Sequence, residues 1–78
     1  MDTYEKTRQI LAANIRAARA RARMSQEGLA LEADVDRTFV SQIEREVGNP
    51  SLRTLCQIAA ALKTSVTELL LPPPTRKP

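Results

Sequence analysis

The sequence predicts an all-α protein, a compact bundle of about five helices, and three observations support this fold class. Apolar residues recur at helical spacing in successive segments of the chain. A Ser or Asp that can cap a helix stands directly before each of these segments. Aromatic residues make up only 3% of the chain, so the core must be built from Leu, Ile, Val, Ala and Met, which favours small, closely packed helices.

The first three predicted helices follow their caps directly. The segments are Thr3–Ala22, Gln26–Ala33 and Arg37 to about Glu46, and the caps are Asp2, Ser25 and Asp36. The inward face of the first helix is expected to consist of Leu11, Ile15, Ala18 and Ala22. Its outward face carries Arg8, Arg16, Arg19, Arg21 and Arg23. We interpret Arg21 and Arg23 as a solvated face, and the arginines that border the next two helices as groups that attract phosphate.

A break at Asn49 and Pro50 separates the third helix from the fourth, because a residue that precedes proline avoids the helical region. Ser51 caps the fourth helix. The expected buried row of this helix is Leu52, Leu55, Ile58, Ala59 and Leu62. Cys56 falls on or near that row, and we expect it to be a buried thiol.

A capping-box pattern, Ser65 to Glu68, opens a short fifth helix that is expected to run from Val66 to about Leu71. Three consecutive prolines then stop it. We expect one helical domain over residues 1–71 and a disordered Pro-rich tail over residues 72–78.

Composition excludes several functions. With no His and one Cys, a zinc site of the usual type cannot be assembled, nor can a Ser–His–Asp or Cys–His nucleophile. No apolar run approaches the roughly 20 residues of a membrane span, and the N-terminus lacks the apolar region of a signal peptide. The net charge of +3 favours polyanionic partners slightly. We expect a cytoplasmic protein that is not an enzyme, needs no metal or cofactor, and has no membrane or small-molecule partner.

The stretch from Gln26 to Arg45 organises the chain. It contains two short amphipathic helices, and residues 34–36 between them are too few for anything but a tight turn with Val35 pointing inward. Ala30 is small where two steeply crossing helices must come close. A helix, a short turn and a second helix form the arrangement that places the second helix in the major groove of DNA.

These residues resemble the helix-turn-helix family of phage Cro and C1 repressors, also called the xenobiotic-response-element type. The resemblance covers about residues 10–70, and its matching stretches are Met24–Glu27, Leu29–Ala30, Val35–Val40, Ile43–Arg45 and Asn49–Leu52. Arg37 and Thr38, followed by an aromatic residue, are most similar to the controller proteins of restriction–modification systems. The resemblance implies a lambda-repressor-like fold and a regulator that binds an operator.

Candidate DNA-binding residues lie on the outer side of the third helix, opposite Val40 and Ile43. Base readout is assigned to Arg37, Thr38, Ser41 and Gln42. Phosphate contacts are assigned to Gln26, Arg45, Asn49 and Ser51, for which the resemblance points the same way. Two alternatives stay open, because Gln26 could be an ordinary helix-start residue and Arg45 could serve the negative end of its own helix.

The chain departs from the family pattern at three positions. A glycine usually follows the Glu-Arg pair as a left-handed cap, whereas this chain has Glu46. We therefore expect the third helix to extend by about two residues to a cap at Gly48, which would bring a carboxylate near phosphates. Gly48 itself replaces a residue that is often basic, and Arg23 stands where glycine is frequent.

Two structural expectations follow. In the family, the positions of Arg19 and Glu44 pair between the first and third helices, which implies a partly buried ion pair here. The fifth helix carries more apolar residues than one core-facing side can absorb, which predicts a two-fold interface with Lys63 at its rim. The predicted interface residues are Val66, Leu69 and Leu70. The alternative is a fifth helix packed wholly on its own chain.

The leading hypothesis is a sequence-specific transcription regulator that acts as a homodimer on a palindromic operator of double-stranded DNA, in its most specific form a restriction–modification controller. RNA polymerase is a further candidate partner. A phage-type repressor, an antitoxin-like autoregulator and a helix-turn-helix module that binds only protein are the alternatives.

Overall fold

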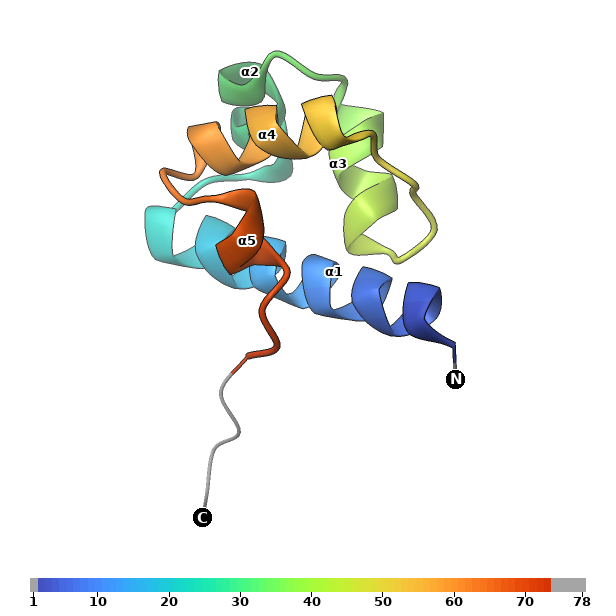
Figure 1. The fold of residues 1–78 in the computed structure, drawn as a ribbon. Coiled ribbons are helices and arrows are strands. Elements are labelled where there is room, and N and C mark those ends of the chain that lie inside the picture. Colours follow the sequence, from blue (N-terminus) through green and yellow to red (C-terminus); the bar gives the residue numbers. More distant parts are fainter. Residues whose placement is uncertain (1, 74–78) are drawn as a thin grey trace.

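The computed structural model describes residues 2–73, and this part of the chain is built from helices alone (Figure 1). The helices are α1 (Thr3–Ala22), α2 (Gln26–Ala33), α3 (Arg37–Glu44), α4 (Leu52–Ala61) and α5 (Val66–Leu69). The long α1 lies along one side, α2, α3 and α4 gather above it, and α5 packs against α1 and α4. The predicted all-α bundle is confirmed. No helix within residues 2–73 combines the length and the apolarity needed to cross a membrane.

The predicted start of every helix is confirmed, because the expected cap accepts a hydrogen bond from the first turn. The acceptors are the side chains of Asp2, Ser25, Asp36, Ser51 and Ser65. The capping distances lie between 2.8 Å for Asp2 with Glu5 N and 3.1 Å for Ser65 with Glu68 N. Local chemistry therefore fixes where each helix begins.

The core lies where α1, α2, α3 and α4 meet. Its largest fully buried side chains are Ile15, Leu29, Val40 and Ile58, one from each of these helices. Burying such a side chain contributes about 1.5–3 kcal/mol. Ala30 is 3% exposed, which agrees with the expected close approach of α2 to its neighbours. A side-chain hydrogen bond also joins α4 to α2: the Nε2 of Gln57 donates to the carbonyl of Ala33, at the end of α2, at 3.1 Å.

Part of the predicted core is wrong. Cys56 is exposed, and Leu52 is 69% exposed. Ile58 and Ala59 are buried as predicted, and Leu55 and Leu62 are partly buried against the core. The helix α4 also buries Thr54, which was not predicted. Cys56 and Ile58 are two residues apart, about 200° around a helix, so the two cannot both face the core. In α1, the predicted inward residues are buried except Ala22 in the last turn, which is exposed.

The end of α3 also differs from the prediction. The helix stops at Glu44, and Glu46 adopts the left-handed conformation, with φ of 65°. Its N–H donates to the carbonyl of Ile43, and the N–H of Val47 donates to that of Gln42, the two bonds of a Schellman cap. Glu46 thus takes the glycine role, and no extension to a cap at Gly48 occurs.

Gly48 is needed for a different reason. Its φ is not positive, but a Cβ at this position would lie 3.1 Å from the backbone nitrogen of Ile43. The loop after α3 folds back closely on the end of that helix, and a side chain would push it away. Gly28 has a similar explanation, because a Cβ there would lie 3.2 Å from the Oγ of Ser25, the atom that caps α2.

The fifth helix is shorter than predicted, since α5 ends at Leu69 instead of about Leu71. Leu71 precedes Pro72, and a residue before proline disfavours the helical region. Asn14 of α1 binds this end of the chain, because its Nδ2 donates to the carbonyls of Leu69 and Leu71, both at 2.7 Å. Most of the predicted tail, residues 74–78, lies outside the described residues.

Candidate nucleic-acid interface

The turn between α2 and α3 is built by two aspartates and one valine. Asp34 ends α2 in the left-handed conformation, with φ of 60°, and the N–H of Val35 donates to the carbonyl of Ala30 at 3.0 Å. Val35 packs against the core, as predicted. Asp36 then caps α3 by accepting from the N–H of Thr38 at 2.8 Å, and this backbone hydrogen bond lowers the pKa of the Asp36 carboxyl. The predicted helix, turn and helix are present.

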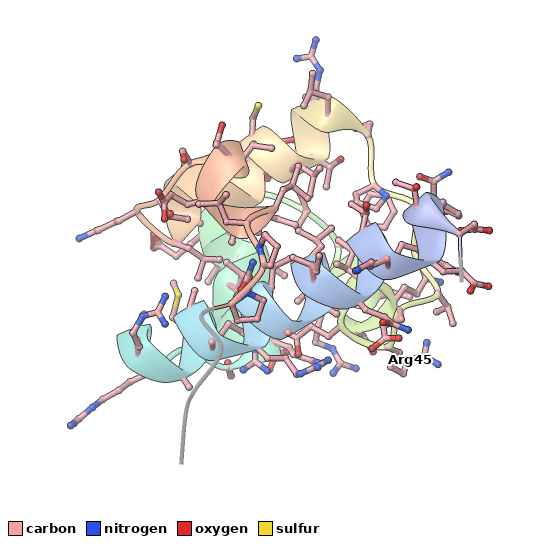
Figure 2. The ribbon with its side chains drawn as sticks, turned by 60° about the horizontal axis from the view of Figure 1, so that its bottom comes forward. Arg45 is labelled. Carbon is pink, nitrogen blue, oxygen red and sulfur yellow. The ribbon has the colours of Figure 1, made fainter. Side chains whose placement is uncertain are left out.

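The outer side of α3 carries a row of polar side chains opposite the buried Val40 and Ile43. The members of this recognition row are Arg37, Thr38, Ser41, Gln42 and Arg45. Arg37, Thr38 and Arg45 are exposed, and the other two are partly exposed. Within residues 2–73, four side chains of the row form no hydrogen bond or ion pair with the rest of the protein, whereas the hydroxyl of Thr38 donates to the carboxylate of Asp36 and helps to lower its pKa. Figure 2 shows Arg45 at the edge of the molecule. The row can therefore offer its donors to a ligand.

The other side of α3 is joined to α1 by the expected ion pair. Arg19 holds the carboxylate of Glu44 with two donors, Nε to Oε2 at 2.6 Å and an Nη to Oε1 at 2.8 Å. The side chain of Glu44 is only 4% exposed, and that of Arg19 is 19% exposed. A two-pronged contact of this kind fixes the direction of both groups. It sets the position of α3 relative to α1.

The surroundings of the ion pair favour the charged form of both Glu44 and Arg19. Burial raises the pKa of Glu44, but the hydrogen bonds from Arg19 and Gln26, with the positive charges of Arg19 and Arg16, outweigh it and hold that pKa below its usual value. The hydrogen bond to Glu44 raises the pKa of Arg19, although burial opposes it. Glu44 is therefore ionised at neutral pH in spite of its burial.

Sequence reasoning missed two partners of Glu44. Arg16 donates from an Nη to the backbone carbonyl of Glu44, at the negative end of α3. Gln26 donates from Nε2 to the Oε1 of Glu44 at 3.0 Å. The first had a signal, because Arg16 and Arg19 are three residues apart on one helix and so share a face. The second had none, since Gln26 and Glu44 are brought together only by the fold.

The remaining predicted phosphate-contacting residues, Asn49 and Ser51, lie in the segment between α3 and α4, and both are exposed. The Oγ of Ser51 accepts from the N–H of Thr54 at 3.1 Å and donates to the Oγ1 of Thr54 at 3.0 Å. It is therefore occupied by capping, whereas the amide of Asn49 forms no hydrogen bond with residues 2–73.

The predicted interface residues on α5 differ in exposure. Leu69 is 2% exposed and belongs to the monomer core, so it has almost no surface to give to a partner. Val66 and Leu70 are partly exposed, and Leu71, which follows the helix, is 49% exposed. A hollow of about 300 Å³ lies beside Leu71 between α1 and α5, and Asn14, Arg21 and Glu68 also line it.

Comparison with known proteins defines the class of this protein. A family profile described as helix-turn-helix matches residues 15–69, so the chain belongs to this helix-turn-helix family. The sequence is 44% identical over 69 residues to a hypothetical transcription factor of Neisseria meningitidis. The matched residues make up 88% of this chain and 65% of that protein. It is 43% identical over 63 residues to the control protein C.SmaI of Serratia marcescens. Here the matched residues make up 81% of this chain and 75% of that protein.

Solved structures agree with this placement. The crystal structure of the hypothetical transcription factor NHTF from Neisseria superposes with a TM-score of 0.84 at 40% identity, over 94% of this chain and 84% of that one. The restriction-modification controller protein C.AhdI from Aeromonas hydrophila superposes with a TM-score of 0.76 at 32% identity, over 80% of this chain and 94% of that one. Restriction–modification controllers are thus among the relatives of this chain.

Proposed function

We propose that this protein is a sequence-specific transcription regulator that binds operator DNA, and that it controls a restriction–modification operon. The observation that carries the proposal is the recognition row, five polar side chains on the outer face of α3, of which all but Thr38 have no partners in residues 2–73. The control proteins among its relatives support the more specific part of the proposal.

In this proposal, the recognition row enters the major groove with the N-terminal end of α3 leading. Arg37 stands at that end, where its guanidinium can span the O6 and N7 acceptors of one guanine. Gln42 can address adenine with its amide, and Thr38 and Ser41 are short enough to let the helix approach the base edges. Gln26, Arg45 and Asn49 then contact the phosphates on either side. Ser51 joins them by turning its hydroxyl hydrogen from Thr54 to a phosphate.

The regulator acts as a homodimer, so that two copies of α3 read the two halves of a palindromic operator about 34 Å apart. The pairing surface uses Val66 and Leu70 together with Leu71, which are the apolar residues at this end that remain exposed or partly exposed. Lys63, exposed near the end of α4, lies at its rim. Leu69 supports this surface from inside the monomer core.

A gel-shift titration on the DNA upstream of the protein's own gene tests the function, with shuffled DNA of the same composition as the control and the salt concentration stated. We expect the upstream DNA to bind at least about a thousandfold more tightly than the shuffled DNA. Equal affinity for the two would mean a general polyanion binder, and no binding at all would favour a module that contacts only protein.

Sedimentation tests the assembly. The wild-type protein should sediment as a dimer at tens of micromolar, and Leu71→Glu should shift it to monomer without unfolding it. Leu69→Glu is not a useful test, because a carboxylate in the core would destabilise the monomer itself. A matched control is Leu31→Glu, since Leu31 is 83% exposed on α2 and away from α5. A wild-type monomer, or a dimer that tolerates Leu71→Glu, would contradict the proposed pairing surface.

A further inference from the structure

We propose that Glu44 is a positioning residue for DNA binding, which holds the side-chain amide of Gln26 so that one N–H stays directed at a DNA phosphate. The inference rests on the proposed function. It assigns to the buried Glu44 a task beyond the ion pair that joins α1 to α3.

The geometry places one carboxylate against both helices of the motif. Glu44 is the last residue of α3 and Gln26 is the first residue of α2, and they meet with the amide Nε2 3.0 Å from Oε1. The same Oε1 accepts from Arg19 at 2.8 Å, and the other oxygen accepts from Arg19 at 2.6 Å. Both oxygens of the carboxylate are therefore held by Arg19, and the carboxylate cannot move with the Gln26 side chain.

Arg19 closes the arrangement into a ring. One of its Nη atoms also donates to the backbone carbonyl of Met24 at 2.8 Å, two residues before Gln26. The backbone that leads into α2 and the carboxylate that holds the Gln26 side chain are thus attached to the same guanidinium. A shift of α3 relative to α2 would break the ring at one of these contacts.

The chemistry of the carboxylate decides which way the amide faces. An ionised carboxylate only accepts hydrogen bonds, so the NH₂ end of Gln26 must face Glu44 and the amide cannot turn over. The NH₂ group has a second hydrogen, and Gln26 is only partly buried. A DNA phosphate also only accepts, so this second N–H is the group that it needs. Holding the side chain in advance also spares the ordering cost, an advantage of about two- to tenfold in affinity.

A double-mutant cycle on operator affinity tests the coupling. Gln26→Ala should weaken binding about fivefold in the wild-type background, the effect of one hydrogen bond. In the Glu44→Gln background it should weaken binding less than about twofold, because a glutamine can present either oxygen or NH₂ and no longer imposes one orientation. Asn49→Ala is the matched control, because the exposed Asn49 forms no hydrogen bond with Glu44, and it should cost the same factor in both backgrounds.

Three outcomes of the cycle would overturn the proposal. They are a Gln26→Ala effect of equal size in the two backgrounds, a Gln26→Ala variant with unchanged operator affinity, and a Glu44→Gln change that removes the effects of Gln26 and Asn49 alike. The last would mean that Glu44 only maintains the fold. If the folded wild-type protein binds no DNA, the proposed function fails as a whole, and this result is distinct from the other three.

An NMR measurement on the free wild-type protein needs no variant at position 44. The side-chain NH₂ signals of Gln26, assigned by their loss in Gln26→Ala, should lie apart from those of the exposed Gln9. They should also shift at acid pH, when Glu44 takes up a proton, while the signals of Gln9 stay in place. Signals of Gln26 that coincide with those of Gln9 and do not respond to pH would overturn the proposal.

Discussion

Polar side chains occur on two sides of α3, and they differ in whether they have partners inside the protein. On the side that faces α1, Glu44 accepts from Arg19 and Gln26 and its carbonyl accepts from Arg16. On the outer side, the recognition row forms no such bonds with α1, and apart from Thr38, which donates to Asp36, its side chains have no partners within residues 2–73. A polar side chain that is satisfied inside the molecule fixes the helix, and one that is left open is available to a ligand. Substitutions on the two sides should therefore affect different properties.

The largest effect is expected on the satisfied side. Arg19→Met should lower the free energy of unfolding by about 2–3 kcal/mol, because it leaves the buried carboxylate of Glu44 without its main partner. This is below the cost for a fully buried pair, since the Arg19 side chain is 19% exposed. Urea denaturation measures it, and Arg21→Met on the exposed face of the same helix should change stability by less than about 0.5 kcal/mol. Equal losses of stability in the Arg19→Met and Arg21→Met proteins would contradict the proposed role of the ion pair.

The open side should respond in DNA affinity instead. Arg37→Ala should cost about 1–3 kcal/mol on the operator and far less on shuffled DNA, with stability unchanged within about 0.5 kcal/mol. Arg45→Ala should weaken both DNAs alike, and it should reduce the slope of log affinity against log salt by about one. Fluorescence anisotropy at several salt concentrations separates the two. If Arg37 behaves like Arg45, it is a phosphate contact, and specificity comes from the rest of the row or from DNA shape.

The pH dependence of stability tests the ionised state of Glu44 in the folded protein. The pKa of Glu44 is lower in the folded protein than in the unfolded chain, so its contribution is present above the unfolded value, about 4.5. It is lost as the pH falls through the lowered pKa of the folded state. As the pH falls below about 4.5, wild-type stability should therefore fall more steeply than that of Glu44→Gln. Identical acid limbs for the two proteins would mean that Glu44 is not preferentially ionised in the fold.

The smallest effect is expected at the loop that follows α3. Glu46→Gly should raise stability by about 0.5 kcal/mol, because relief of the left-handed strain exceeds the added flexibility of the unfolded chain. Glu46→Ala keeps the Cβ and should give no such gain. Both changes should tighten DNA binding modestly, since both remove a carboxylate that the proposed docking brings near phosphates. A gain in stability with alanine as large as that with glycine would contradict the strain argument.

The sequence predicted the features that depend on local chemistry. Every helix start was correct, because a cap such as Ser25 or Asp36 acts on the N–H groups two or three residues away. Helix ends were less accurate, because Glu46 adopts a conformation that its residue type disfavours, and only the packing of the Gly48 loop against α3 reveals why the turn forms there.

Features that depend on how the helices pack against one another could be predicted from the sequence only in part. The pairing of Arg19 with Glu44 came from family resemblance, whereas the bond from Gln26 to Glu44 and those from Asn14 to the end of α5 join residues with no shared pattern. Leu69 looked available for an interface because the composition of α5 does not show which of its leucines the monomer itself covers. Cys56 was misplaced for a different reason, because its position about 200° around α4 from Ile58 already indicates the outer side.

The exposure of Cys56 has a practical consequence for any study of assembly. It is the single cysteine of the chain and lies on the outer side of α4, so two molecules can become covalently linked only through this one sulfur. Such a link would persist in sedimentation at any dilution and would resemble tight association through α5. A thiol reductant, or a Cys56→Ser protein, keeps the two kinds of pairing apart. The same sulfur also offers one defined attachment point per chain for a fluorescent reporter.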